Sequence, residues 1–178
     1  MKRIFLIGYM GAGKTTVGRR LAKSLALTFI DLDAYIEGRY RKRVSELFLE
    51  KGEEAFRRIE REMLREVATF EDAVISTGGG APCFFDNMEV MNRAGTTVYI
   101  SVAPEELAAR LQASHTVRPI LEERTGEELT AFITGHLARR EPYYRQAHII
   151  YHSLRLITKK EVNQTVQEIE QLLEQVKS

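Results

Sequence analysis

The sequence predicts an α/β fold in which a parallel β-sheet has helices on both faces. Short apolar segments alternate along the chain with segments that have the three- and four-residue spacing of amphipathic helices, the pattern of successive βα units. The first apolar segment, residues 3–7, has the near-continuous apolar character of a parallel strand buried on both faces. With 178 residues and an apolar fraction of 44%, the chain suits one compact domain, so we expect residues 1–178 to form a single domain.

Composition limits the classes of partner. The 26 basic and 25 acidic residues nearly cancel, so nothing favours a nucleic acid or a membrane surface as the main partner. No stretch approaches the roughly 18 apolar residues of a membrane-spanning helix. Cys83 is the only cysteine, which rules out an internal disulfide and makes the reducing cytoplasm the expected compartment. We interpret Cys83 as a small packing residue, because no nearby histidine would activate it.

Residues 8–15 (GYMGAGKT) match the P-loop pattern G-x-x-x-x-G-K-S/T at every fixed position. They lie between the first strand and the helical spacing of residues 16–26, which is the context that a P-loop requires. The fixed glycines let backbone N–H groups approach phosphate oxygens, and Lys14 adds positive charge for the β- and γ-phosphates. Thr15 offers a hydroxyl to Mg²⁺. A plain glycine-rich turn is the alternative, and the full match in this context favours the P-loop.

Residues 28–33 are expected to form the second strand. Asp31 and Asp33 are two positions apart, so in a strand both side chains project to the same side, at the C-terminal end. Ligands of α/β sheets bind at that edge, where the P-loop also opens. Either aspartate taken alone could instead cap a helix that begins near Ala34. The two acids together favour a functional role.

The basic run at residues 39–43 lies between two short helical stretches. We interpret it as a solvated turn and not as a nucleic-acid site, because of that placement. Ser45 is expected to cap a short helix that ends at Gly52.

A long amphipathic helix is expected to begin at Glu53. Its apolar residues recur at three- and four-residue intervals: Phe56, Ile59, Met63, Val67 and Phe70. Its other face is mostly Arg and Glu, with Glu53 four positions before Arg57 and Glu54 four before Arg58. This spacing stabilises exposed helices. Spacing alone therefore predicts that Arg57 lies on a solvated face with ion pairs.

Three consecutive glycines, Gly78, Gly79 and Gly80, follow the short apolar strand expected at residues 73–76. They lie at the same edge of the sheet as the P-loop. Glycines at this position let the backbone approach a ligand closely and present N–H groups to it. A plain flexible turn is the alternative, and the shared edge favours a ligand site.

The rest of the chain continues the alternation. We expect strands at residues 97–102 and 147–151, and helices at 104–113, 127–140 and 159–176. Pro142 is expected to break the helical pattern. The four histidines lack metal-ligand spacing, so we interpret them as packing or surface residues.

Residues 114–126 have no clear period and are rich in polar side chains, which suits a mobile flap. Arg118 precedes Pro119, which biases Arg118 towards an extended backbone. Its guanidinium is therefore expected to be held over a ligand and not wound into a helix.

Together these features indicate a nucleoside-triphosphate site with Mg²⁺. The guanine-reading pattern N-K-x-D is absent from the sequence, which argues against a GTPase switch. Acids at the second strand can serve Mg²⁺ and an acceptor hydroxyl, while the arginines can hold an anionic acceptor. A small-molecule kinase fits these features best.

The motifs resemble those of the shikimate kinase family over nearly the whole chain. They are Gly8-x-x-Gly11-x-Gly13-Lys14-Thr15, Asp31-x-Asp33, Gly52-Glu53-x-x-Phe56-Arg57-x-x-Glu60, Gly78-Gly79-Gly80, Arg118-Pro119 and Arg140-x-Pro142-x-Tyr144. The resemblance implies a three-layer P-loop kinase fold whose five-stranded parallel sheet has the order 2-3-1-4-5. It also implies ATP- and Mg²⁺-dependent phosphorylation of the shikimate 3-hydroxyl in aromatic amino-acid biosynthesis.

The resemblance further implies a role for each matching residue. Lys14, Asp33 and Arg118 would be catalytic, and Asp33 would contact the acceptor hydroxyl. Shikimate would be held by Asp33, Arg57, Gly78, Gly79, Gly80 and Arg140, with both arginines on its carboxylate. Nucleotide would be bound by Gly11, Ala12, Gly13, Lys14, Thr15, Thr16, Arg110 and Arg118, with Arg110 on the adenine. Thr15 and Asp31 would bind Mg²⁺. The role that the resemblance implies for Arg57, on the shikimate carboxylate, reverses the solvated-face interpretation of that residue.

The sequence departs from the family pattern at residues 81–83 and 151–153, where the acceptor site and the adenine loop are expected. Two alternatives remain. One is a related kinase for gluconate or a nucleoside monophosphate, against which the triple glycine argues together with Arg57 and Arg140. The other is a regulatory protein that binds nucleotide without transferring phosphate, against which the presence of Lys14, Asp33 and Arg118 argues. A monomer is expected.

Overall fold

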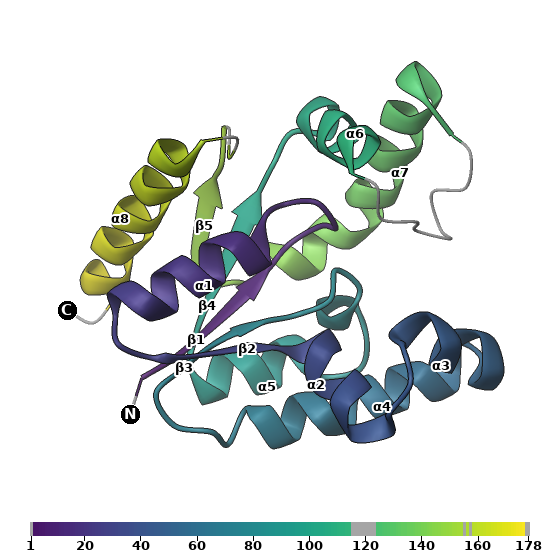
Figure 1. The fold of residues 1–178 in the computed structure, drawn as a ribbon, viewed down its shortest axis with the longest axis horizontal. Helices are drawn as coiled ribbons and strands as arrows, with labels where there is room; N and C mark the ends of the chain where they lie inside the picture. Colours follow the sequence, from purple (N-terminus) through teal and green to yellow (C-terminus); the bar gives the residue numbers. More distant parts are fainter. Residues whose placement is uncertain (1, 115–123, 155, 157, 177–178) are drawn as a thin grey trace.

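The computed structural model describes residues 2–114, 124–154, 156 and 158–176. Its centre is a five-stranded sheet in which all neighbouring strands are parallel, in the order β2-β3-β1-β4-β5 (Figure 1). The strands are β1 (Arg3–Ile7), β2 (Thr28–Asp31), β3 (Ala73–Ser76), β4 (Thr96–Ser101) and β5 (Ile149–His152). The predicted α/β class is confirmed, as is the strand order that the resemblance implied.

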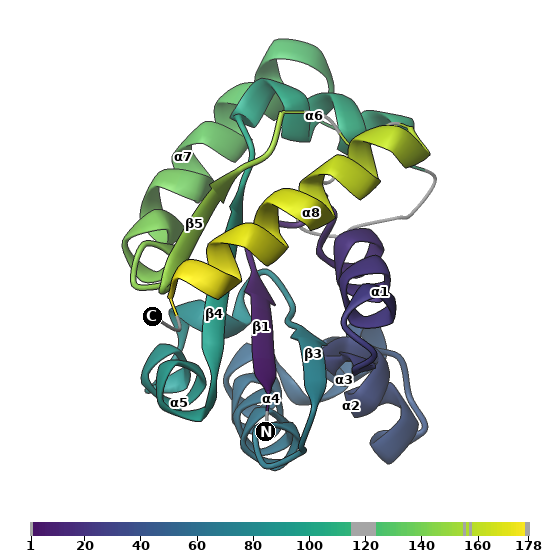
Figure 2. The same cartoon turned by 90° about the vertical axis from the view of Figure 1, so that its left-hand side faces the viewer.

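Helices cover both faces of the sheet. They are α1 (Lys14–Ser24), α2 (Leu32–Tyr40), α3 (Val44–Lys51), α4 (Glu53–Val67), the short 3₁₀ helix η1 (Ala81–Cys83), α5 (Asn87–Ala94), α6 (Pro104–Ala113), α7 (Gly126–Tyr144) and α8 (Lys159–Gln175). Helices α1 and α8 pack together over one face, and α4 and α5 pack together over the other (Figures 1 and 2). The result is a three-layer arrangement around a central apolar core.

The strands supply the middle of that core. Phe5, Leu6 and Ile7 of β1 are fully buried, as the continuous apolar run predicts. The apolar row of α4 faces the same core, and its members from Phe56 to Val67 are buried. The register sets the ends of neighbouring strands level, because Ser76 of β3 is paired with both Leu6 and Asp31. The C-terminal ends of β1, β2 and β3 therefore meet at one edge of the sheet.

The predicted strand at residues 28–33 is too long. β2 ends at Asp31 and α2 begins at Leu32, so Asp33 lies in the first turn of a helix and not in a strand. The cause is the side chain of Asp31, whose Oδ1 accepts hydrogen bonds from the N–H groups of Asp33 (3.1 Å) and Ala34 (3.2 Å). This helix cap ends the strand two residues early. The two carboxylates share one edge because of the cap and not because of strand alternation.

The predicted break at Pro142 is also wrong. Helix α7 continues through Pro142 to Tyr144, so the proline lies in its last turn. Proline at this position removes the helical hydrogen bond to the carbonyl of residue 138, but the rest of the last turn keeps its helical form. The turn is closed by Arg145, whose N–H donates to the carbonyl of Glu141 over 2.9 Å, and Tyr144 is fully buried.

Two shorter features were outside the reach of sequence patterns. Helix α5 has only eight residues, and its buried methionines Met88 and Met91 are too few to establish a period. Helix α3 begins after Arg43 and not after Ser45, because the Glu46 carboxylate accepts the N–H of Arg43 over 2.7 Å. The predicted end of this helix at Gly52 is confirmed.

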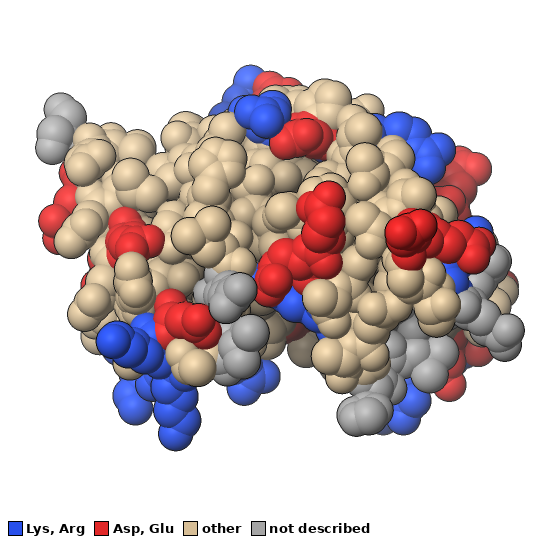
Figure 3. Space-filling model, turned by 90° about the horizontal axis from the view of Figure 1, so that it is seen from above, with Lys and Arg blue, Asp and Glu red and all other residues tan. Residues whose placement is uncertain are grey.

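Charges of both signs occur on the face in Figure 3, where basic and acidic side chains of the described residues are interspersed with uncharged ones. The basic run at residues 39–43 takes part in ion pairs, since Arg39 lies 3.5 Å from Glu66 and Lys42 pairs with Glu50 over 2.5 Å. Among the described helices, none is long and apolar enough to cross a membrane.

Candidate active site

The P-loop, residues 8–15, connects the end of β1 to the first turn of α1. Gly13 immediately precedes α1 and has φ 92°, in the left-handed region that favours glycine. Gly8 has φ 146°, and a Cβ on it would lie 2.7 Å from the carbonyl oxygen of Ile100 on β4. The path of the loop therefore requires both glycines, and it brings the loop over the N-terminus of α1, where anions bind.

Lys14 is buried inside this loop, with 9% of its surface exposed. Its Nζ donates hydrogen bonds to the carbonyl oxygens of Gly8 (2.8 Å) and Tyr9 (2.9 Å). The lysine thus borders the cavity described below while its ammonium group is hydrogen-bonded within the loop. An ammonium group in this position can contact an anion that enters the loop.

Thr15 and Asp31 are joined across the first two βα units. Thr15 Oγ1 donates to Asp31 Oδ2 over 3.0 Å, while Asp31 Oδ1 caps α2. Asp31 therefore has both of the roles between which the sequence left a choice: it caps a helix and it faces the P-loop. A hydroxyl and a carboxylate oxygen this close together fit the oxygen ligands that Mg²⁺ prefers.

Asp33 lies in the first turn of α2 beside these groups. Burial, and after it the nearby Asp31 carboxylate, raise the pKa of Asp33 to about 6 against the opposing effect of Lys14 and Arg57. The carboxyl group thus changes protonation state near neutral pH. Such a group can accept a proton from a neighbouring hydroxyl.

The glycine triplet passes close to three of the predicted site side chains. A Cβ on each glycine would lie close to one of them: on Gly78, 3.0 Å from Asp33 Oδ1; on Gly79, 3.4 Å from Arg140 Nη1; on Gly80, 2.5 Å from Arg57 Nη2. A side chain at position 78 or 80 would therefore press on the Asp33 carboxylate or the Arg57 guanidinium, whereas a methyl group at position 79 would be in ordinary contact with Arg140. The triplet is therefore the surface against which they are packed.

Arg57 is 8% exposed, so the solvated-face prediction from spacing is wrong for this residue. Its Nη1 donates to Glu60 Oε2 over 2.8 Å, and its Cζ lies 4.3 Å from the centre of the Phe84 ring. The neighbouring pair of Arg58 and Glu54 is exposed, as predicted. Arg57 Nε is buried and has no hydrogen-bond partner among the described residues, which suits a site that receives an anion.

Glu60 is a further residue of this site that sequence reasoning did not single out. It is 1% exposed, and burial raises its pKa while the Arg57 charge lowers it. The signal was present in the sequence, because Glu60 is three positions after Arg57 and follows the buried Ile59. A buried carboxylate of this kind holds an arginine in a fixed orientation.

Arg140 approaches the triplet from α7. Its Nη1 is a buried nitrogen without a hydrogen-bond partner among the described residues. The hydroxyl of Tyr144, one turn further along α7, donates to the carbonyl oxygen of Gly79 over 2.5 Å. Two arginines thus flank the glycine triplet, each with a buried donor nitrogen that has no hydrogen-bond partner among the described residues.

A cavity of about 330 Å³ at this edge of the sheet gathers most of the predicted residues. The predicted residues that line it are Gly11, Gly13, Lys14, Thr15, Thr16, Asp31, Asp33, Gly78, Gly79 and Arg110. Ala12, Gly80, Arg57 and Arg140 do not line the cavity itself. Arg118 and most of the predicted flap lie outside the described residues.

Arg110 borders the cavity beside the P-loop. Its Nε donates to Glu106 Oε1 over 2.9 Å, and its Nη1 lies 3.4 Å and 3.3 Å from the carbonyl oxygens of Gly11 and Ala12. Arg110 Nη2 is buried and has no partner within the described part of the chain. The position is compatible with the adenine contact that the resemblance implied.

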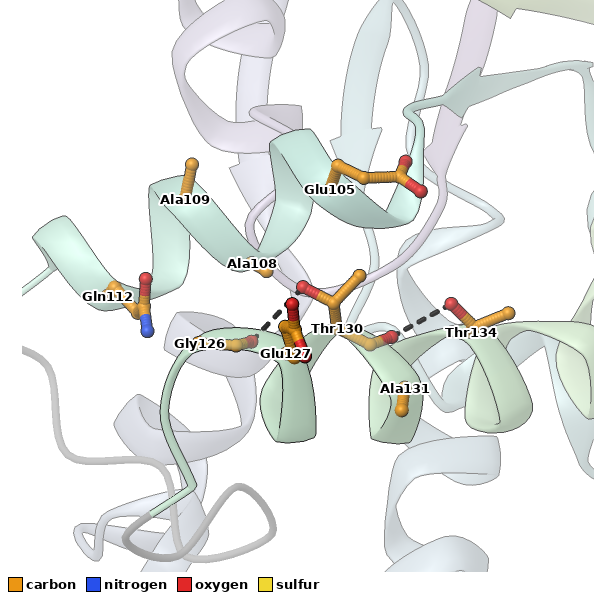
Figure 4. Close-up of a pocket in the computed structure, with 9 residues that line it drawn as sticks. All are labelled: Glu105, Ala108, Ala109, Gln112, Gly126, Glu127, Thr130, Ala131 and Thr134. Carbon is orange, nitrogen blue, oxygen red and sulfur yellow. Dashed lines mark hydrogen bonds between the residues drawn. The ribbon is translucent and has the colours of Figure 1, made fainter.

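A larger hollow of about 560 Å³ lies between α6 and α7, away from these groups (Figure 4). Small side chains such as Ala108, Ala109 and Ala131 line much of it. The hydroxyls of Thr130 and Thr134 donate to carbonyl oxygens of their own helix, at 3.2 Å and 2.8 Å (Figure 4). Volume alone therefore does not identify the site, since this hollow lacks the convergent polar groups of the P-loop cavity.

Metal-ligating side chains and the single cysteine are the other titratable groups of interest. Within the described ranges, no three His, Cys, Asp or Glu side chains are grouped as metal ligands. Burial raises the pKa of Cys83 to about 11, so its thiol stays protonated at neutral pH. That state suits a packing residue and not a nucleophile.

The three-layer fold and a P-loop that faces two aspartates, with two arginines beside the adjoining glycine triplet, define a P-loop phosphotransferase of small molecules. A family model described as shikimate kinase matches residues 10–174. The chain belongs to the shikimate kinase family. A shikimate kinase from Parabacteroides distasonis is 62% identical over 163 residues, which cover 92% of this chain and 94% of that protein.

Solved structures agree. The crystal structure of a shikimate kinase from Bacteroides thetaiotaomicron has a TM-score of 0.94 and 53% identity, and covers 97% of this chain and 98% of its own. A shikimate kinase from Acinetobacter baumannii in complex with shikimate has a TM-score of 0.88 and 32% identity, covering 99% of this chain and 95% of its own.

Proposed function

We propose that this protein transfers the γ-phosphoryl group of ATP to the 3-hydroxyl of shikimate, in the biosynthesis of aromatic amino acids. One observation carries the proposal: a P-loop cavity adjoins a glycine triplet that is flanked by two arginines, each with a buried donor nitrogen that has no hydrogen-bond partner among the described residues. A substrate with a carboxylate satisfies those donors, and a hydroxyl on the same molecule can then face the P-loop. Membership of the family and the relative in complex with shikimate support this choice of acceptor.

ATP is proposed to bind with its phosphates in the P-loop. The backbone N–H groups from Gly11 to Thr16 and the start of α1 would surround the phosphate oxygens, and Lys14 would contact the β- and γ-phosphates. Arg110 would lie on the adenine. Arg118 is proposed to contact the transferring group, an assignment that rests on the sequence alone.

Mg²⁺ is proposed to be held by Thr15 and, through water, by Asp31. When bound there, the ion would neutralise part of the negative charge of the phosphates. The support from the structure is the donor set, since the Thr15 hydroxyl and the Asp31 carboxylate are 3.0 Å apart at the cavity. Asp31 remains oriented for this role by its cap to α2.

The acceptor is proposed to be held at both ends. Arg57 and Arg140 would bind the shikimate carboxylate, and Asp33 would contact the 3-hydroxyl. In the reaction the hydroxyl oxygen forms a bond to the γ-phosphorus, the bond between that phosphorus and the β,γ-bridging oxygen breaks, and ADP leaves. The ionised Asp33 accepts the hydroxyl proton, for which a pKa of about 6 is well placed.

We propose that the protein acts as a monomer in the cytoplasm. The single cysteine of the sequence, Cys83, is consistent with a reducing compartment.

Coupled measurement of ADP release tests the proposed function. The purified protein with Mg²⁺ and ATP is assayed against shikimate, gluconate, a nucleoside monophosphate and no acceptor. Shikimate alone is expected to increase ADP release, and the increase should disappear with EDTA. Equal release with gluconate, or release that no acceptor changes, would overturn the proposal.

A further inference from the structure

A tyrosine within the P-loop is bonded to a histidine of α7. Tyr9 is 1% exposed, and its hydroxyl lies 2.8 Å from Nδ1 of His136. The two rings meet edge to face, with centres 5.5 Å apart and an interplanar angle of 85°. This contact joins two segments that are 127 residues apart in the sequence.

The same tyrosine ring also contacts Arg140. The Cζ atom of Arg140 lies 5.7 Å from the centre of the Tyr9 ring, and Arg140 follows His136 by one helical turn. Tyr9 therefore touches two residues on one face of α7. Its carbonyl oxygen accepts the hydrogen bond from Lys14 Nζ, so one residue contacts both the lysine of the P-loop and the arginine of the acceptor site.

The two arginines of the acceptor site are held differently. Arg57 is fixed by an ion pair with the buried Glu60. Arg140 pairs with no carboxylate among the described residues, so its placement depends on the packing of α7 against the P-loop and on its contacts with Tyr9 and Tyr144. A loosened α7 would therefore affect Arg140 more than Arg57.

We propose that Tyr9 and His136 form a positioning pair that fixes the face of α7 carrying Arg140 at a set distance from the P-loop. The pair thereby sets the spacing between the carboxylate of the acceptor and the phosphate that it receives. This inference rests on the proposed function, because it assigns the pair to the binding of shikimate.

The surroundings of His136 suit this role. Burial and the charges of Arg140 and Arg139 lower the pKa of His136 to about 4, so the ring is neutral at pH 7 and its Nδ1 shares one hydrogen bond with the Tyr9 hydroxyl. Phe132 packs on the other side of His136, with ring centres 5.5 Å apart. The imidazole is thus held between two aromatic rings in the orientation that the hydrogen bond needs.

Three variants separate the hydrogen bond from simple packing. Tyr9→Phe keeps the ring on Arg140 and removes the hydroxyl. His136→Leu removes Nδ1 and with it the hydrogen bond to Tyr9. His136→Asn restores an amide group near the position of Nδ1 and serves as the conservative rescue. As a matched control, Tyr151→Phe removes a hydroxyl that bonds Glu168 over 2.6 Å, between β5 and α8.

Steady-state kinetics with shikimate and ATP varied separately is the readout, together with the melting temperature. Loss of one neutral hydrogen bond predicts an increase of about 2- to 10-fold in the shikimate KM for Tyr9→Phe and His136→Leu, with a smaller change in the ATP KM. The double variant should be no worse than either single variant, because both remove the same bond. His136→Asn should recover most of the loss, and Tyr151→Phe should leave the shikimate KM unchanged.

The two proposals fail in different ways. If the wild-type protein shows no shikimate-dependent ADP release, the proposed function is wrong. If the wild type is active but Tyr9→Phe and His136→Leu lower the melting temperature without a change in shikimate KM, the pair is only structural and this inference is overturned. Tyr9→Phe alone decides the matter if His136→Leu does not fold.

Discussion

The guanidinium of Arg57 lies directly against Gly80, where a methyl group would approach Nη2 to 2.5 Å. Gly80 has φ −85° and ψ −23°, values that any residue can adopt. The glycine is therefore explained by the neighbouring arginine and not by the backbone. Gly80 thus belongs to the proposed acceptor site, because it leaves space for the Arg57 guanidinium.

Gly80→Ala should accordingly displace Arg57 without straining the chain. We expect the shikimate KM to increase by roughly tenfold or more, the size expected for a disturbed hydrogen bond to a charged group. Gly38→Ala is the control, because a Cβ there meets nothing within 4 Å in the exposed part of α2. The control should stabilise the helix by about 0.5–1 kcal/mol and leave KM unchanged. A wild-type KM in Gly80→Ala would show that Arg57 does not hold the substrate.

Arg57 and Arg58 offer a second matched comparison, since both have an acidic residue four positions before them on α4. Arg57→Ala should weaken shikimate binding by about 1.5–3 kcal/mol, and Arg58→Ala should leave it unchanged. Lysine at position 57 is expected to restore binding only in part, because it lacks the planar pair of donors.

Removal of Arg57 also leaves Glu60 buried without its partner, which costs stability. The free energy of unfolding from urea denaturation should therefore fall in Arg57→Ala and recover in the double variant with Glu60→Gln. Shikimate binding should stay weak in that double variant. If binding recovered together with stability, the arginine would have a structural role alone.

Lys14→Ala tests the P-loop. We expect kcat to fall by several orders of magnitude while the shikimate KM changes little, because the lysine stabilises charge on the transferring group. Near-UV circular dichroism and a cooperative unfolding transition serve as the check on folding. Loss of that transition would contradict the assignment, since it would make the lysine a requirement of the fold.

The raised pKa of Asp33 predicts a pH dependence for catalysis. If the ionised carboxylate accepts the hydroxyl proton, kcat/KM for shikimate should fall about tenfold per pH unit below pH 6 and level off above it. Asp33→Asn should remove most activity at every pH. A profile that stays flat between pH 5 and 7 in the wild type would argue against Asp33 as the base.

The raised pKa of Asp33 should make stability fall with rising pH, whereas catalysis should increase. Because the folded-state pKa of about 6 exceeds the usual value of 3.8, the folded state binds more protons than the unfolded state between these pH values. The contribution of Asp33 to stability is therefore present below pH 4 and is lost as pH rises to 6. Melting curves of Asp33→Asn should show a stability gain over wild type that grows across this window and then stays constant.

Residue spacing along the sequence predicted much of the fold, but it failed for residues whose burial depends on contacts between distant segments. The P-loop, the buried strands and the apolar row of α4 follow from spacing along the chain. Spacing could not distinguish Arg57 from Arg58, since only packing against Gly80 and Phe84 buries the first. The extra residues of α7 beyond the predicted end depend on the burial of Tyr144, and the pairing of Tyr9 with His136 depends on a contact between distant segments.

The two carbonyl groups that hold Lys14 affect how the loop selects its ligand. Oxygens of Gly8 and Tyr9 already occupy donors of the ammonium, so an entering phosphate competes with the protein's own backbone. The measured affinity for phosphate therefore reflects the replacement of backbone carbonyl oxygens around the ammonium by phosphate oxygens. Adenosine, which carries no phosphate, can make no such exchange and should gain nothing from the lysine. The carbonyl oxygens of the loop thus compete with a ligand for the Lys14 ammonium, and this competition favours ligands with several phosphate oxygens.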